Sequence, residues 1–164
     1  MVAFRGRSRH GHPSQLTVTV QESRNHGESS KVLIVCGGNT CRSPMAAAML
    51  TELLDSAAHI ESAGVDADEG RPAQPNAISV MAERGLDISA HVSRDMDSVG
   101  TKKFDVVIAM EPAVAHRLES YQLEASRIEV LNIEDPFGRR IQHMKSILEL
   151  ARGVRGRASP KLKE

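Results

Sequence analysis

A cysteine and an arginine enclose a short segment that contains glycine. Cys36 and Arg42 bracket five residues, two of them glycine, and Ser43-Pro44 follows directly. Glycines let successive backbone N–H groups turn inward, which makes a binding site for an anion. Arg42 can donate two parallel hydrogen bonds to the oxygens of a phosphate group. The segment therefore predicts a phosphate-binding loop that begins with a thiol.

Cys36 is the predicted nucleophile of this loop. The amides and the guanidinium that would bind a phosphate also favour the thiolate, which is the nucleophilic form of cysteine. The alternative is an inert buried thiol, since free cysteine is among the most buried residue types. The loop is not the ATP-type phosphate loop, which ends in Gly-Lys followed by Ser or Thr. The residues alone thus indicate attack by a thiolate on phosphorus, with a structural cysteine as the alternative.

Strand and helix patterns alternate around this loop. Apolar runs predict strands at 32–35, 59–62, 104–110 and 128–131, and helical spacing of apolar residues predicts helices at 44–57, 75–85, 112–121 and 141–151. A broken helical segment is expected at 89–98, and 16–20 alternates like a short extra strand. The alternation implies an α/β fold with a four-stranded parallel sheet and helices on both faces. Ligands of such sheets bind beyond the carboxyl ends of the strands, where the loop after Cys36 lies.

Composition and charge argue against several classes of protein. The 21 Lys and Arg balance 21 Asp and Glu, and the basic surplus lies at the two ends, so the middle of the chain is acidic. An acidic body with 2% aromatic residues argues against nucleic-acid binding. The apolar runs are too short to span a membrane, and the first residues lack the apolar stretch of a secretory signal. Two cysteines without a signal indicate a reducing compartment, so we expect a cytoplasmic protein without a membrane partner.

The ends of the chain differ in composition from its middle. Residues 1–30 are rich in Arg, Ser, His, Gly and Asn, and we expect an extension that buries little surface. Residues 154–164 predict a basic tail, which leaves 31–153 as the expected domain. No His, Cys and Asp cluster has the spacing of metal ligands, so we expect neither a metal nor another cofactor.

The loop resembles the signature of the low molecular weight protein-tyrosine phosphatases, through Val35-Cys-Gly-Gly-Asn-Thr-Cys-Arg-Ser-Pro-Met-Ala46. Further blocks resemble the family in the family's order, at Glu61–Gly64, Leu86–Arg94, Phe104–Met110 and Ile133–Gly138. The resemblance covers about 31–153. It implies a Rossmann-like three-layer sandwich and the hydrolysis of a phosphorylated protein, with inorganic phosphate as the product.

The same resemblance implies a two-step mechanism. Cys36 attacks phosphorus while Arg42 and the loop amides bind the phosphoryl oxygens. Asp135 protonates the leaving group and then activates the water that hydrolyses the cysteinyl-phosphate. Without the resemblance, Asp135 would be an ordinary loop acid before a proline. The residues implied to form the phosphate-binding loop are Gly37, Gly38, Asn39, Thr40, Cys41 and Ser43.

Supporting roles also follow from the resemblance. Ser43 is implied to stabilise the thiolate by a hydrogen bond, and Asn39 to shape the loop through contacts with Ser62 and His91. Such a buried polar network makes a loop rigid only if all its members are hydrogen-bonded. Taken alone, His91 would be a helix-capping histidine on the surface.

The residues of the implied substrate pocket depart from the tyrosine-specific pattern. Asp68 stands where animal members have a large aromatic residue, which leaves Phe137 as the aromatic wall. Thr40 resembles the bacterial protein-arginine phosphatases of the family, whereas many tyrosine-specific members have an aliphatic β-branched residue there. A guanidinium substrate would also benefit from the carboxylates of Asp68 and Asp135. The alternative is neutral drift at Thr40, so phosphoarginine and phosphotyrosine both stay open as substrates.

Three other functions use a similar loop. Arsenate reductases of this fold need further cysteines to pass on a disulfide, and this chain has only Cys36 and Cys41. A phosphate-binding module has no use for a leaving-group acid such as Asp135. Cys41 matches the family's second cysteine, which forms a reversible disulfide that protects the nucleophile from irreversible oxidation. A thiol redox sensor is therefore compatible with catalysis, and the alternative for Cys41 is a small loop residue without a redox role.

Overall fold

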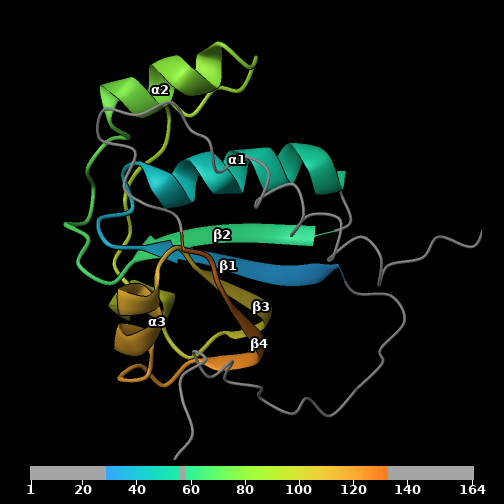
Figure 1. Cartoon of the computed structure of the whole chain (residues 1–164), viewed down its shortest axis with the longest axis vertical. Helices are drawn as coiled ribbons and strands as arrows, with labels where there is room; N and C mark the ends of the chain where they lie inside the picture. The colour runs from blue at the N-terminus through green and yellow to red at the C-terminus, as the bar shows by residue number, and fades with distance from the viewer. Residues whose placement is uncertain (1–28, 56–57, 133–164) are drawn as a thin grey trace, which may run out of the picture.

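The computed structural model describes residues 29–55 and 58–132, which form a parallel sheet covered by helices (Figure 1). The strands are β1 (Ser30–Cys36), β2 (Ala58–Gly64), β3 (Lys103–Ala109) and β4 (Glu124–Val130), in the order β2-β1-β3-β4. The helices are α1 (Arg42–Leu54), α2 (Pro75–Ala82) and α3 (Pro112–Leu118), with a 3-10 turn, η2 (Asp97–Val99). All described strand pairs are parallel, so the predicted α/β fold is confirmed.

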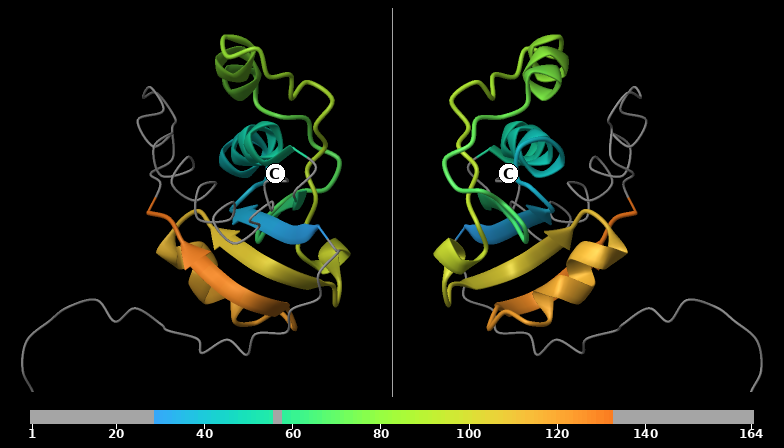
Figure 2. Two further views of the ribbon diagram at one scale, coloured as in Figure 1. Left: turned by 90° about the vertical axis from the view of Figure 1, so that its right-hand side faces the viewer. Right: turned by 90° about the vertical axis from the view of Figure 1, so that its left-hand side faces the viewer.

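The central strand β1 supplies side chains to two cores, one on each face of the sheet. Val32 and Ile34 belong to the core under α1 and α2, whereas Leu33 and Val35 belong to the core on the side of α3. All four side chains are 0% exposed, as expected for an apolar strand that is buried on both faces. Figure 2 shows α1 directly on the sheet with α2 outside it, and α3 on the opposite face. Helices on both faces are therefore confirmed.

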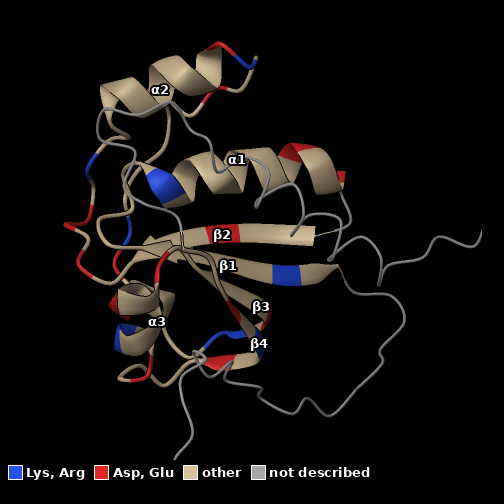
Figure 3. Cartoon of the chain, in the orientation of Figure 1, with Lys and Arg blue, Asp and Glu red and all other residues tan. Residues whose placement is uncertain are grey.

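Helix α1 begins where the loop ends, and its sequence explains its place on the sheet. Pro44 lies in the first turn, where its missing N–H has no helical partner to lose. Ala46, Leu50 and Leu54 follow at four-residue spacing and are all buried against the sheet. Charged residues stand only near the two ends of the helix (Figure 3). This apolar face fixes α1 with its N-terminus at the carboxyl end of β1.

The order of the strands reverses direction at β1. The chain passes from β1 to β2 on one side, and it reaches β3 on the other side of β1. Ligand sites of open α/β sheets lie at this kind of reversal, beyond the carboxyl ends of the strands. Cys36 is the last residue of β1, and Glu111 follows the end of β3. The loop after Cys36 therefore lies at the reversal, as the sequence predicts.

The predicted broken helix at 89–98 is wrong, apart from the short turn η2. Ser93 N donates to Arg71 O over 2.8 Å, and Arg94 N donates to the side chain of Asn39 over 2.8 Å. These backbone groups bind distant segments, so they cannot form the local hydrogen bonds of a helix. Val92 also forms an isolated antiparallel bridge with Pro72.

One predicted strand begins elsewhere in the structure, and several predicted segments cannot be compared with it. Strand β4 starts at Glu124, earlier than predicted, because its polar first half pairs with β3 from Lys103 onward. The predicted strand at 16–20, the helix at 141–151, the extension 1–30 and the tail 154–164 lie outside the described residues. No helix in the described ranges is long and apolar enough to cross a membrane.

Gly64 at the end of β2 lies directly against the loop that follows β1. A Cβ atom added to Gly64 would lie 2.3 Å from Gly37 O and 2.9 Å from Asn39 N. Both of these are backbone atoms, so a rotation of a side chain cannot relieve the overlap. Glycine is required here for close approach of two backbones, a requirement that the sequence alone does not reveal.

We predict that Gly64→Ala destabilises the fold by about 1–3 kcal/mol, because an added methyl group in a packed site forces the backbone to shift. Urea denaturation measures the free energy of unfolding. Gly38→Ala is the matched control, since a Cβ there would meet only the Thr40 side chain at 3.8 Å. Equal stability of the two alanine variants would contradict the close approach.

Candidate active site

The loop between Cys36 and Arg42 takes its sharp turn at an asparagine. Asn39 has a φ of 51°, in the left-handed region that asparagine tolerates better than most residues. Gly37 and Gly38 have no positive φ, which corrects the expectation that the glycines supply the unusual conformation. A Cβ on Gly37 would meet no atom within 4 Å. The glycines therefore leave open space beside the loop, and Asn39 provides the turn.

The side chain of Asn39 is the centre of a buried hydrogen-bond network. Its Nδ2 donates to Ser43 Oγ over 2.8 Å and to Ser62 Oγ over 3.0 Å. Its Oδ1 accepts the backbone N–H of Arg94 over 2.8 Å, and its backbone oxygen lies 2.7 Å from His91 Nε2. Asn39 is 0% exposed. The structure thus brings Asn39, Ser43, Ser62 and His91 together, with the backbone of Arg94 as a partner that the sequence did not reveal.

The sulfur of Cys36 lies inside this network. Cys36 is 2% exposed, and its Sγ lies 3.0 Å from Ser43 Oγ and 3.3 Å from the donating N–H of Asn39. Ser43 Oγ also accepts a hydrogen bond from Asn39 Nδ2, and in its contact with Cys36 either the serine hydroxyl or the thiol can be the donor. The other acceptor near this hydroxyl, Ala63 O, is more distant at 3.5 Å. The hydroxyl of Ser43 and the backbone N–H of Asn39 therefore both lie within hydrogen-bond distance of the sulfur that the sequence predicts to be the nucleophile.

Arg42 is held beside the loop by an acid that the sequence analysis missed. Its Nη1 lies 2.9 Å from Glu111 Oε1, and its side chain is 12% exposed. Glu111 directly precedes α3, beyond the end of β3. The ion pair fixes a guanidinium whose donors are arranged in a rigid fork that matches phosphate oxygens. An acid directly after a predicted central strand was the available sequence signal.

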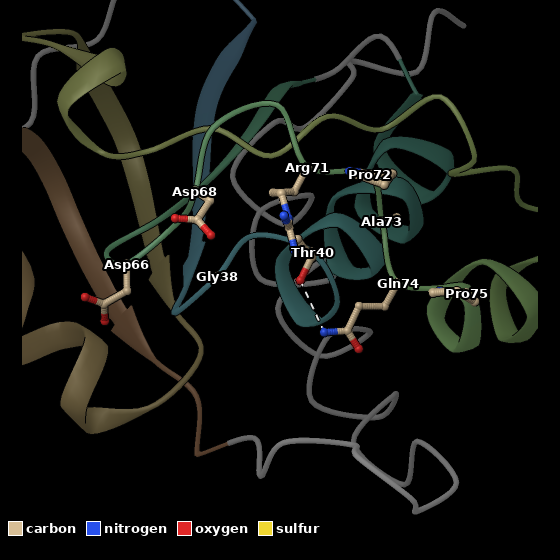
Figure 4. A pocket seen from close by; sticks show the side chains of 9 residues that line it. All are labelled: Gly38, Thr40, Asp66, Asp68, Arg71, Pro72, Ala73, Gln74 and Pro75. Atoms are coloured by element: carbon tan, nitrogen blue, oxygen red, sulfur yellow. Dashed lines mark hydrogen bonds between the residues drawn. The ribbon is translucent and has the colours of Figure 1, made fainter.

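A hollow of about 460 Å³ opens beside the loop (Figure 4). Its lining residues are Gly38, Thr40, Asp66, Asp68, Arg71, Pro72, Ala73, Gln74 and Pro75. None of these residues is aromatic, so the part of the wall that the structure describes offers no ring for stacking. The sequence-predicted pocket residues Thr40 and Asp68 both lie on this wall.

The two acids of the hollow differ in their partners. Asp66 forms a hydrogen bond and an ion pair with Arg117, and this bond raises the pKa of the arginine. The Asp68 carboxylate has no hydrogen-bond or ion-pair partner among residues 29–55 and 58–132, and the residue is exposed. Asp68 is therefore the acid of this wall that is available to a cationic ligand group.

The other residues that the sequence predicts for the site are the two cysteines, Asp135 and Phe137. In the described ranges, neither Cys36 nor Cys41 forms a disulfide bond. Asp135 and Phe137 lie outside the described residues, so their roles stay predictions from the sequence. In the part of the chain that the structure describes, no group of three or more His, Cys, Asp or Glu residues could hold a metal ion.

An ion-pair cluster on β2 supports the network from outside. Glu61 accepts hydrogen bonds from Arg94 Nη2 over 2.6 Å and from Lys102 Nζ over 3.1 Å. Burial raises the pKa of Glu61, but the two hydrogen bonds and the two positive charges together hold this pKa below its ordinary value of 4.5. Because the backbone of Arg94 binds Asn39, the cluster secures one of the loop's contacts.

The chain is similar to several known proteins. The family model described as low molecular weight phosphotyrosine protein phosphatase matches residues 31–154. A probable low molecular weight protein-tyrosine-phosphatase, EpsP of Ralstonia nicotianae, is 34% identical over 75% of this chain and 90% of its own length. A protein-arginine-phosphatase of Geobacillus stearothermophilus is 46% identical over 40% of this chain and 44% of its own. The crystal structure of a low molecular weight protein tyrosine phosphatase from T. tengcongensis has a TM-score of 0.60 and 34% identity, covering 79% of this chain and 97% of that one.

We predict that Glu61→Gln lowers Tm at pH 7 by roughly 2–6 °C, because two cations lose their charged partner. A carboxylate with a depressed pKa stabilises the fold above the unfolded-state pKa, and this contribution is lost as the pH falls through the folded-state pKa. The difference from the unsubstituted chain should therefore shrink as the pH falls below 4.5. Thermal unfolding between pH 3 and pH 7 measures it, with the exposed Glu52→Gln as control. A difference that does not change with pH would exclude this role of Glu61.

Proposed function

The chain belongs to the low molecular weight phosphotyrosine protein phosphatase family, and we propose that it hydrolyses phosphorylated protein side chains through a phosphoryl group carried on Cys36. One observation supports this most strongly: the Cys36 sulfur lies 3.0 Å from the Ser43 hydroxyl and 3.3 Å from the donating N–H of Asn39, within a loop that Arg42 flanks. A binding module needs no nucleophile, whereas phosphoryl transfer to a thiolate needs this arrangement.

In the first step, the Cys36 thiolate attacks phosphorus in line with the leaving group. A sulfur–phosphorus bond forms while the bond to the substrate's oxygen or nitrogen breaks, and Asp135 gives its proton to the departing atom. The loop amides, the N-terminus of α1 and Arg42 stabilise the charge on the equatorial oxygens.

In the second step, the phosphoryl group passes to water. The Asp135 carboxylate removes a proton from water, the water oxygen bonds to phosphorus and the sulfur–phosphorus bond breaks. Ser43, whose hydroxyl lies 3.0 Å from the sulfur, stabilises the departing thiolate. Inorganic phosphate leaves, and both Cys36 and Asp135 return to their starting protonation states.

For the substrate, we favour phosphoarginine over phosphotyrosine. The described wall of the hollow carries the carboxylate of Asp68 and the hydroxyl of Thr40, and no aromatic residue. A guanidinium has only donors, so a wall that offers the Asp68 carboxylate and no aromatic ring suits it better than a phenyl ring. Relatives named for each substrate exist, which keeps phosphotyrosine as the second candidate. Because Cys36 must stay reduced to act as the nucleophile, we propose that the enzyme is in the cytoplasm, which is a reducing compartment.

We predict that Cys36→Ser reduces hydrolysis of p-nitrophenyl phosphate by a thousandfold or more, since removal of a catalytic nucleophile has effects of at least about that size. The dissociation constant of inorganic phosphate should change by less than about threefold, because the donors of the loop remain. Steady-state kinetics and calorimetric titration provide the two measurements. Hydrolysis at the original rate would rule out the mechanism.

We predict that Thr40→Ile lowers the ratio of kcat/KM for a phosphoarginine peptide over that for a phosphotyrosine peptide by about tenfold. Isoleucine adds apolar surface to the wall of the hollow, which favours a phenyl ring over a guanidinium. Thr40→Ser adds no apolar surface and should keep the ratio near its original value. The ratio comes from parallel assays of the two peptides. If Thr40→Ile leaves it unchanged, Thr40 does not determine the preference.

A further inference from the structure

Gln74 binds Thr40 through two separate hydrogen bonds. The backbone N–H of Gln74 donates to Thr40 O over 2.8 Å, and the side-chain Nε2 donates to Thr40 Oγ1 over 3.3 Å (Figure 4). Gln74 directly precedes α2, yet its side chain makes no capping hydrogen bond to that helix. The side-chain amide is therefore directed to the loop after β1 and not to the start of the helix.

The direction of the side-chain bond determines what Thr40 can offer to a ligand. An amide nitrogen only donates, so Thr40 Oγ1 is the acceptor. A hydroxyl has one proton, and in the described part of the chain no acceptor binds the proton of Thr40. Thr40 lines the hollow beside Gly38. Its proton is therefore available to an oxygen that enters the hollow, and the bond from Gln74 strengthens it as a donor.

We propose that Gln74 is a positioning residue, which keeps the Thr40 hydroxyl as a hydrogen-bond donor to an oxygen of the bound phosphoryl group. The inference rests on the proposed function in one respect, namely that the loop binds a phosphoryl group. Gln74 itself need not touch the substrate, since it acts through Thr40.

The side-chain hydrogen bond of Gln74 can be removed while its backbone hydrogen bond to Thr40 remains. The backbone bond of 2.8 Å already links Gln74 to Thr40, and it survives any side-chain substitution at position 74 except proline. Gln74 is only half-buried, so a longer or charged side chain does not disturb the core. A loss of phosphate binding after such a substitution would thus reflect the donor state of Thr40 and the charge at position 74.

A double-mutant cycle separates these two effects. Gln74→Glu places an acceptor beside Thr40, which captures the hydroxyl proton, and it also adds a negative charge that repels phosphate. Thr40→Val removes the hydroxyl but retains the shape. In the Thr40→Val background only the repulsion remains, so the difference between the two backgrounds measures the hydroxyl's contribution.

The measured quantity is the dissociation constant of inorganic phosphate, from calorimetric titration near pH 7. We expect Gln74→Glu to raise this dissociation constant by a factor of about ten or more in the Thr40 background. In the Thr40→Val background the factor should be roughly fivefold smaller. Thr40→Ser should restore the larger effect, because serine keeps the hydroxyl. An equal effect of Gln74→Glu in the Thr40 and Thr40→Val backgrounds would overturn the proposal.

A neutral variant tests for a merely structural role. Gln74→Met has similar length but no hydrogen-bonding group, so nothing holds the Thr40 hydroxyl as a donor, and the dissociation constant of phosphate should rise by about threefold in the Thr40 background and stay unchanged in the Thr40→Val background. A merely structural role would raise it equally in both backgrounds. An equal rise, or no rise in the Thr40 background, would overturn the inference.

Phosphate binding does not require turnover, so the double-mutant cycle can contradict the role of Gln74 even if Cys36 is the nucleophile. Conversely, a Cys36→Ser variant with unchanged hydrolysis would disprove the proposed mechanism and leave the cycle interpretable. Absence of phosphate binding by the unsubstituted chain would overturn both.

Discussion

The buried amide of Asn39 is the interaction on which the rest of the site depends. Its three hydrogen bonds join the loop after β1, the end of β2 and the backbone of Arg94. A buried amide with all these groups bonded is stable, whereas its loss would leave several buried groups without partners at a cost of about 1–3 kcal/mol each. The same amide donates to Ser43, whose hydroxyl lies 3.0 Å from the Cys36 sulfur. The shape of the loop and the surroundings of the sulfur thus depend on the same side chain.

The fold supplies these partners from segments that are far apart in the sequence. Parallel crossovers bring the end of β2 beside the end of β1, and the segment from His91 to Arg94 passes along the same edge. Gly64 permits the backbones to approach closely there. On the other side of β1, Glu111, which follows strand β3, fixes Arg42 through an ion pair. The arrangement of the candidate site therefore requires the whole sheet order, although the loop that begins at Cys36 is short.

Local patterns predicted the central strands and the loop, because apolar runs and the Cys36-to-Arg42 spacing are visible within a few residues. Other features depend on distant contacts and could not be read this way. The segment at 89–98 resembles a helix locally, but its backbone groups bind remote partners. Likewise, Gly64, Glu111 and Gln74 act through residues well separated from them in the sequence. The family resemblance correctly grouped Asn39 with its side-chain partners, which spacing alone could not have done.

The most direct test of the account is to trap the phosphoryl group on the enzyme during turnover. Rapid quenching after mixing with substrate, followed by mass spectrometry of the peptides, locates any adduct. The account predicts a phosphorylated Cys36 that forms and decays at rates compatible with steady-state turnover. Substrate hydrolysis at full rate with Cys36 unmodified at all times, or with the phosphoryl group on another residue, would contradict it.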